Sequence, residues 1–204
     1  MAKRPEMLGA REGREHRFLN VFFCVVFIVI LLIFAADFWF TQNYVLVIVD
    51  GRSMEDTLSD GDALYVSVRE EVERGDIIVL NVTSRPDLFP HEAGEERFII
   101  KRAIALEGDE IYAEGGIVYL KAAGESEFMA LSEPYTKGET GDFGPVTVGE
   151  GEVFFLGDHR DNSLDSEENG CLPLSCILGV ATDFTLAHID LITGWVRFWH
   201  PGLV

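Results

Sequence analysis

The stretch RFIIKRAIA, residues 97–105, is an apolar run interrupted by a lysine and an arginine, and it reads as a β-strand. Side chains alternate between the two faces of a strand, so the face that carries Lys101 is otherwise apolar. Its other members are Ile99, Ala103 and Ala105. A charged amine there is costly unless it is paired or neutral, and burial can lower a lysine pKa of about 10.4 by ~3–5 units. Lys101 is therefore a candidate general base, although the pattern alone favours a lysine that reaches solvent or pairs with an acid.

Five further β-rich runs are separated by clusters of Gly, Pro and Asp. They cover residues 44–49, 63–68, 76–82, 117–120 and 152–156. Because no segment between Ala36 and Ala181 has a convincing helical period, the predicted fold class is mainly β. Irregular loops are expected at residues 83–96 and 126–145.

The C-terminal part of the chain fits a pair of strands over residues 180–196. An aromatic cluster follows at residues 195–199. We expect this cluster to lie in the core, and contact with a membrane surface is the alternative.

An uncharged apolar segment, residues 18–36, precedes the β-rich part of the chain. As a helix it would reach roughly 29 Å, about the hydrocarbon thickness of a bilayer. The alternative is a cleaved secretory signal, which would have a shorter apolar core and small residues before the cut. Here the bulky Phe34 stands at the third position before a cut after Ala36. We therefore predict one N-terminal transmembrane helix, residues 18–36.

Charge is divided unevenly along the chain. Residues 1–17 carry five basic and three acidic side chains, a net charge of +2, which leaves −21 for the remainder of a chain of net charge −19. The basic tail, residues 1–17, is expected to stay in the cytosol, with residues 37–204 forming an extracytoplasmic domain on the outer face. Such an acidic surface would repel nucleic acid and anionic lipid. No nucleic-acid partner is predicted, and attachment to the lipid bilayer must come from apolar contacts or the span.

The cysteines follow this topology: Cys24 lies in the span, and Cys171 and Cys176 lie in the outer domain. An oxidising exterior favours a disulfide between the latter two, but so tight a loop can be strained, and two free thiols are the alternative. A zinc site would need further ligands nearby, and the sequence offers none at suitable spacing, so no metal or other cofactor is predicted.

A turn of sequence GRSM, residues 51–54, follows the β-rich run at residues 44–49. Gly51 would let the backbone approach a ligand closely, and main-chain amides there could hold an oxyanion. Ser53 needs a base to become a nucleophile, and Lys101 is a candidate for that base. In isolation, Ser53 fits better a turn serine that makes a local hydrogen bond.

A third polar segment, GDHRDNSLDS, occupies residues 157–166. Its acidic and hydroxyl side chains alternate at Asp161, Ser163 and Asp165. A calcium loop is one explanation, but the EF-hand pattern needs Gly and Glu where this chain has Ser166 and Leu172. A Ser-His-Asp triad through His159 is another, which the surrounding charges disfavour.

Together, the order and content of these segments resemble the type I signal peptidases, a family of bacterial serine endopeptidases with a Ser-Lys dyad. The resemblance rests on an N-terminal anchor, GRSM with Thr57 and Leu58, KRAIAL at residues 101–106 with Gly108 and Asp109, and the run at residues 157–166. It covers the chain from Tyr44 onward. It implies antiparallel sheets that form a partly open, barrel-like catalytic domain.

The resemblance also implies roles for the matching residues. Ser53 would attack the scissile carbonyl to form an acyl-enzyme, and Lys101 would take its proton and later activate water. The Ser53 amide would supply one oxyanion donor, and because some relatives have a serine at the position of Gly51, a second donor here would come from the backbone.

Four residues of the third segment match supporting groups of that family. Ser163 matches the serine that orients the lysine amine, and Asp165 matches an acid that organises the same region. Asp158 and Arg160 match structural polar groups of the loop.

The implied substrates are the signal peptides of exported preproteins, cut after a small residue. Shallow apolar pockets would reject larger side chains, and an extended substrate could pair with the strand edge at residues 45–49. Relatives in the endoplasmic reticulum have His in place of Lys101, which points to the bacterial cytoplasmic membrane. Association with the secretion machinery is a further expectation.

Three positions depart from the family pattern. Asp56 and Glu107 replace prolines, and Glu167 replaces an arginine that would pair with Asp165. None of them belongs to the dyad, so activity is still expected.

Two other functions fit the chain. One is a membrane-anchored β-domain that binds peptides or sugars without chemistry. The other is a self-cleaving regulator with the same dyad, whose known relatives lack a span.

Overall fold

The computed structural model describes residues 6–92 and 94–203, with side chains from Arg17 onward. It divides into two units, Met1–Asn43 and Tyr44–Val204, which are described separately. Part of the predicted cytosolic tail, residues 1–5, lies outside the described residues, and so do the side chains of residues 6–16.

The first unit contains one helix, α1, at Glu6–Asn43. Within its stretch Arg17–Asn43, the most apolar window of 18 residues has a mean hydropathy of 3.1 and no buried residues, so the length and composition of the helix fit a membrane crossing. A signal sequence near an N-terminus would have the same properties. The helix continues beyond Ala36, where the predicted span ends, and includes the aromatic residues 38–40.

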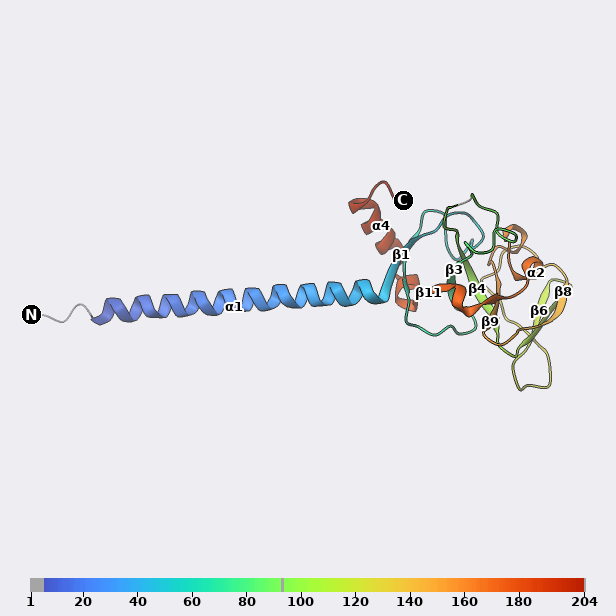
Figure 1. Ribbon diagram of the computed structural model, residues 1–204, viewed down its shortest axis with the longest axis horizontal. Helices are drawn as coiled ribbons and strands as arrows, with labels where there is room; N and C mark the ends of the chain where they lie inside the picture. Colours follow the sequence, from blue (N-terminus) through green and yellow to red (C-terminus); the bar gives the residue numbers. More distant parts are fainter. Residues whose placement is uncertain (1–5, 93, 204) are drawn as a thin grey trace, which may run out of the picture. The chain divides into compact units, whose positions relative to one another are not determined.

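The second unit is built on a seven-stranded antiparallel sheet of order β1-β2-β11-β3-β4-β9-β10 (Figure 1). Its strands are β1 Tyr44–Ile48, β2 Ala63–Ser67, β3 Ile77–Asn81, β4 Phe98–Leu106, β9 Glu152–Leu156, β10 Leu172–Pro173 and β11 Ile177–Ala181. All six β-rich runs of the sequence are strands in it or in the second sheet. The sheet curls, with β1 and β10 as its end strands, and leaves the barrel partly open.

A smaller antiparallel sheet of order β7-β6-β5-β8 completes the domain. Its strands are β5 Glu110–Glu114, β6 Ile117–Lys121, β7 Met129–Ala130 and β8 Phe143–Thr147. Short helical turns lie at α2 Ser166–Asn169, η1 Arg160–Asn162 and η2 Leu174–Cys176. The mainly β prediction is therefore confirmed, although β7 and the start of β8 fall within residues 126–145, a segment that was expected to be irregular.

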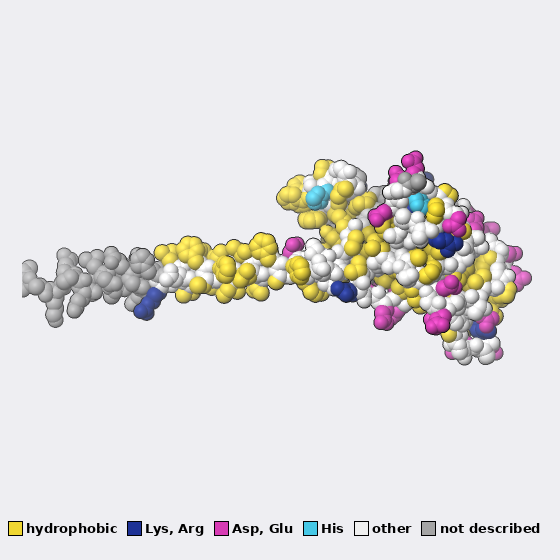
Figure 2. Space-filling model, in the orientation of Figure 1, with side chains coloured by type: hydrophobic (Ala, Val, Ile, Leu, Met, Phe, Trp, Pro, Cys, Tyr) yellow, Lys and Arg dark blue, Asp and Glu magenta, His cyan; other side chains and the backbone are white. Residues whose placement is uncertain are grey.

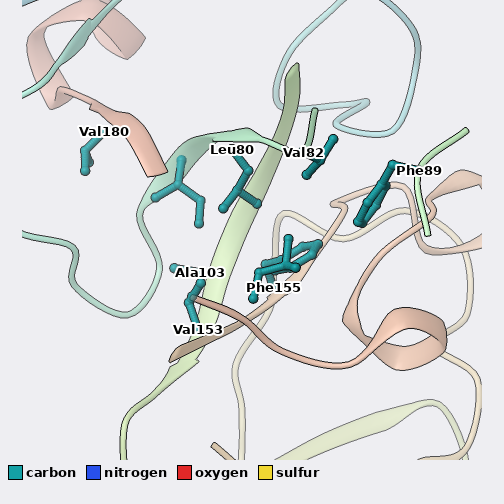
Figure 3. Packing of buried hydrophobic residues seen from close by; sticks show 9 residues of the cluster. Leu80, Val82, Phe89, Ala103, Val153, Phe155 and Val180 are labelled. Atoms are coloured by element: carbon teal, nitrogen blue, oxygen red, sulfur yellow. The ribbon is translucent and has the colours of Figure 1, made fainter. Parts of the chain in front are cut away.

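Apolar side chains from both faces of the large sheet form three buried clusters. The cluster in Figure 3 consists of Ile78, Leu80, Val82, Phe89, Ala103, Val153, Phe155, Leu172 and Val180. A β-bulge between Ala103 and Ala105 shifts the register against β9. Ala105 consequently packs with Ile104 in a second cluster, so the prediction that it shares a face with Ala103 and Lys101 is wrong.

The C-terminal part is helical beyond β11, so the expected pair of strands over residues 180–196 is wrong. α3 spans Asp183–Ala187 and α4 spans Ile189–Trp199. Thr182 caps α3, with its hydroxyl accepting a hydrogen bond from the Thr185 amide at 3.2 Å. The aromatic cluster is not core either: in residues 195–199 only Val196 is buried, and all three aromatic side chains are more than half exposed.

The two cysteines of the domain are free thiols, as is Cys24. Cys171 packs against the second hydrophobic cluster, whereas Cys176 packs against the first. The disulfide favoured from the sequence is therefore absent from the structure, because the two side chains pack against different parts of the core. Burial raises the pKa of the Cys171 thiol to about 11.

Candidate active site

Ser53 and Lys101 meet at one end of the curled sheet. The Lys101 Nζ atom donates a hydrogen bond to the Ser53 Oγ atom over 2.6 Å, although 48 residues separate them in the chain. Lys101 projects from β4 and is only 4% exposed. Burial lowers the pKa of its amine to about 8, the charges of Asp165 and Asp158 partly oppose this shift, and Arg97 adds to it. The amine is thus partly neutral near pH 8 and within reach of the serine proton.

Ser53 is held in a turn that starts after β1. Val49 fixes the start of the turn, because its amide donates to Asp62 and its carbonyl accepts from Gly61. Gly51 adopts φ +97°, a left-handed conformation that a residue with a side chain rarely takes. Among the described residues, the Ser53 amide has no hydrogen-bond acceptor, whereas its carbonyl accepts from the His159 amide at 3.0 Å. The free amide can therefore serve an oxyanion.

Arg102, the next residue on β4, forms a buried ion pair with Asp158. Two hydrogen bonds of 2.8 and 2.5 Å join the guanidinium to the carboxylate. Thr57 donates a third hydrogen bond to Asp158, and the Tyr135 ring lies 4.0 Å from the guanidinium carbon. This pair links the strand of the lysine to the turn of the serine and to the segment at residues 157–166.

Arg160 anchors the same segment from its other side. Its side chain is almost fully buried and donates to the Gly157 carbonyl at 3.1 Å and to the Thr140 hydroxyl at 2.5 Å. It also forms an ion pair with Glu133 at 2.6 Å. Four hydrogen bonds from this guanidinium therefore hold the loop in place.

Asp165 and Ser163 lie behind the dyad. Asp165 is buried and accepts a hydrogen bond from the Gly157 amide at 3.1 Å, and burial raises the pKa of its carboxyl. Ser163 lines the same groove as Lys101 and Ser53, and its buried hydroxyl lowers the pKa of Asp165, against the effect of burial. The predicted hydrogen bond from Ser163 to the Lys101 amine is not formed here, so its role stays a prediction.

The residues that depart from the family pattern have partners of their own. Asp56 pairs with Lys137 at 3.1 Å, and Glu107 accepts a hydrogen bond from the Gly151 amide at 3.0 Å. Glu167 has one buried carboxylate oxygen without a partner, and burial, reinforced by the charge of Asp165, raises the pKa of Glu167. No arginine therefore neutralises Asp165 from this position.

The two alternative chemistries of the polar segment receive no geometric support. The His159 ring faces the Arg52 carbonyl at 3.2 Å, and it is Lys101 that contacts the Ser53 hydroxyl. In the part of the chain that the structure describes, no three His, Cys, Asp or Glu side chains gather as a metal site would require.

A groove of about 760 Å³ leads to the dyad. Its walls include the end of β1, the first half of β4, and Phe89, Pro90 and Leu164, which sequence reasoning did not single out. β1 is an end strand of the sheet, and β9 pairs with β4 only from Arg102 onward. The residues Phe98–Ile100 therefore present a second strand edge, opposite the edge of β1.

The fold and site fit a hydrolase with a serine nucleophile, and comparison with known proteins agrees. Residues 18–185 match the sequence pattern of the signal peptidase family, peptidase S26. The chain is 32% identical over 151 residues to a signal peptidase I of Bacillus amyloliquefaciens, covering 70% of this chain and 73% of the relative. A signal peptidase I of Bacillus licheniformis is 37% identical over 131 residues, with coverages of 58% and 63%.

A solved structure of a signal peptidase I from Enterococcus faecalis V583 is also similar, at 26% identity and a TM-score of 0.42. It covers 55% of this chain and 98% of its own. The chain belongs to the signal peptidase family, peptidase S26. It is accordingly a serine endopeptidase that acts in signal peptide processing.

Proposed function

We propose that Ser53 is the nucleophile and Lys101 the general base in the removal of signal peptides from exported preproteins. The observation that carries this proposal is the 2.6 Å contact between a buried lysine amine and the serine hydroxyl. Desolvation keeps much of the amine neutral near pH 8, as a proton acceptor must be.

The chemistry follows from these positions. The Ser53 Oγ atom attacks the carbonyl before the cut while its proton passes to the Lys101 Nζ atom. The Ser53 amide donates to the oxyanion, and the Lys101 ammonium then gives its proton to the departing amine as the peptide bond breaks. Water, deprotonated by the same lysine, attacks the resulting ester and releases the signal peptide with Ser53 restored.

The supporting residues act by holding this geometry. Asp158 joins Arg102 and Thr57, and Arg160 secures the loop that carries Asp165 and Ser163. Ser163 lines the groove together with Lys101, and its buried hydroxyl would help to orient the amine. Gly51 gives the turn its left-handed residue.

The substrate would bind as an extended strand in the groove. The edges of β1 and of Phe98–Ile100 offer main-chain donors and acceptors on both sides, as strand addition requires. Val47, Ile99 and other apolar residues line the walls, which suits small apolar side chains near the cut.

The long apolar helix supports a membrane-anchored protein. We further propose the topology expected from the sequence: a cytosolic basic tail at residues 1–17, a span at residues 18–36, and a catalytic domain at residues 37–204 on the outer face of the bacterial cytoplasmic membrane. Preproteins delivered by the secretion machinery would meet the domain there.

The test is cleavage of a purified preprotein by the full chain in lipid vesicles. Ser53→Ala should abolish cleavage and the covalent acyl-enzyme seen by mass spectrometry after rapid quenching. Lys101→Ala should lower kcat by about 10²–10⁴-fold. Ser126→Ala, at an exposed loop position, and Lys121→Ala, in the small sheet, are matched controls that should keep wild-type rates.

A peptide-binding domain without chemistry predicts no cleavage by any of these proteins, including the wild type. A self-cleaving regulator predicts fragments of the purified wild-type chain itself. Cleavage that survives Ser53→Ala would contradict the proposed nucleophile.

A further inference from the structure

The two C-terminal helices expose a continuous set of large apolar side chains. They are Phe184 on α3, Leu191, Trp195, Phe198 and Trp199 on α4, and Leu203 after it, each between 54% and 75% exposed. Figure 2 shows yellow side chains gathered over α4, which Figure 1 locates. We call these six residues the apolar helical face.

Helix α4 is apolar on two sides. Thr193 and Val196 are buried, and Ile189 packs against the third hydrophobic cluster, so one side of the helix faces the sheet. The exposed residues Leu191, Trp195, Phe198 and Trp199 follow the spacing i, i+4, i+7 and i+8, which aligns them as a separate stripe. Core packing accounts for the first side only and leaves the outer stripe unexplained.

The charge of this segment sets it apart from the rest of the domain. Residues 183–204 carry Asp183, Asp190 and Arg197, a net charge of −1, whereas residues 44–182 carry −19. The remainder of the domain is therefore strongly repelled by anionic lipid headgroups, whereas this segment is repelled only weakly. Tryptophan beside phenylalanine and leucine is the composition that favours the boundary between lipid and water.

The connection between the domain and α1 argues that a bilayer is the surface that covers these helices. Tyr44, the first residue of the domain, directly follows α1, the helix suited to a membrane span. The helices are fixed to β2, the strand paired with β1: the Thr193 hydroxyl accepts from the Ala63 amide at 2.8 Å, and the Thr185 hydroxyl donates to the Tyr65 carbonyl at 2.9 Å. They are therefore attached to the strand that pairs with β1, the first strand after α1.

We propose that the apolar helical face lies in the headgroup region of the membrane that holds α1, as a second lipid contact of the domain. The match to the family ends at residue 185, so α4 lies beyond the matched residues. A helix lying on the bilayer would fix the tilt of the domain and hence the height of the groove above the lipid. The inference rests on the proposed membrane anchoring and not on the proposed chemistry.

The direct test is depth-dependent quenching of tryptophan fluorescence. The chain has three tryptophans, so Trp39→Phe leaves Trp195 and Trp199 as the only reporters. The full-length variant is reconstituted in phosphatidylcholine vesicles with and without lipids brominated on the upper acyl chain. We expect brominated lipid to remove about half or more of the emission, with a shift of the emission maximum to shorter wavelength.

A matched control carries its single reporter on the smaller sheet. Trp39→Phe, Trp195→Phe and Trp199→Phe are combined with Met129→Trp, at an exposed position of β7. Its emission should be insensitive to brominated lipid, because β6 and β8 of that sheet lie at the other end of the domain from α4 (Figure 1). Equal quenching of both proteins, or quenching of neither, would overturn the proposal. A wavelength shift that disappears on dilution of protein in lipid would assign the face to a second copy of the chain and also overturn it.

A functional measurement separates lipid contact from chemistry. The combined variant Leu191→Gln, Trp195→Gln, Phe198→Gln and Trp199→Gln changes exposed residues only. It should raise KM for a vesicle-inserted preprotein by about tenfold, since a loosely oriented domain presents its groove at a lower effective concentration. It should leave cleavage of a short soluble peptide in detergent unchanged. A KM for the inserted preprotein equal to that of the wild type would contradict the orienting role.

Discussion

The buried ion pair between Arg102 and Asp158 makes a quantitative prediction about stability. In Asp158→Asn the carbonyl oxygen can replace one acceptor, but the amide hydrogens face the guanidinium, and the charge of Arg102 is left uncompensated. Removing one partner of a buried ion pair costs about 3–5 kcal/mol. Arg102 keeps its hydrogen bond to the Gly75 carbonyl and its contact with Tyr135, so we expect the lower end, about 3 kcal/mol.

The assay is unfolding of the full chain in mild detergent, followed by the near-ultraviolet circular dichroism of the domain. For a domain of this size, 3 kcal/mol corresponds to a fall in Tm of roughly 6–12 °C. Asp87→Asn is the matched control, because Asp87 pairs with Arg85 at 3.3 Å on the surface, and it should change stability by less than about 0.5 kcal/mol.

A double variant identifies the origin of the loss. If an unpaired buried charge is the cause, Arg102→Met combined with Asp158→Leu should be more stable than Asp158→Asn alone, since no charge remains to be compensated. A loss below about 1 kcal/mol in Asp158→Asn would refute the view that this pair holds the strand of the lysine to the loop.

Two further predictions concern the dyad. The negative charge of Asp165 raises the pKa of Lys101, so Asp165→Asn should lower the pKa of Lys101 further below 8. The rising limb of the pH–rate profile should then move to lower pH by about one unit. An unchanged limb would show that Asp165 is not ionised beside the amine. A methyl group on Gly157 would stand 2.1 Å from the Ser163 Oγ atom and 2.6 Å from the Ser53 carbonyl oxygen, so Gly157→Ala should lower kcat by about 10²-fold or more through displacement of the serine turn. Gly194→Ala, where no atom lies within 4 Å, is its control and should keep full activity while stabilising α4 by up to about 1 kcal/mol, as measured by unfolding.

Local sequence pattern was sufficient for five strands of the large sheet, β1, β2, β3, β4 and β9, but not for β10 and β11. It raised Lys101 and Ser53 only as candidates, and the family resemblance was needed to single them out. Runs such as residues 152–156 are strongly apolar and bounded by turn residues, and Lys101 is conspicuous because an amine in such a run needs an explanation. The contact itself could not be derived from pattern, because it depends on sheet order. β11, from late in the chain, lies between β2 and β3. The curl of the sheet then brings the turn that follows β1 close to β4.

The errors have physical causes as well. Helix α4 is apolar both toward the sheet and toward its outer stripe, which hides the helical period and makes residues 180–196 resemble strands. The bulge at Ala103–Ala105 changes the alternation that a regular strand would have. The disulfide expectation considered only the short spacing of Cys171 and Cys176, whereas their packing partners belong to different clusters.

The measurement that tests the central claim most directly is the pH dependence of kcat/KM for a soluble peptide substrate, which reports the pKa of the base in the free enzyme. Because burial lowers the pKa of the Lys101 amine to about 8, the account predicts activity that is low at pH 6, rises with an apparent pKa near 8 and then levels off. A rising limb near pH 10 would mean that the lysine is solvated and cannot serve as a base at neutral pH. A limb near pH 6.5 that disappears in His159→Ala would assign the proton transfer to the histidine instead.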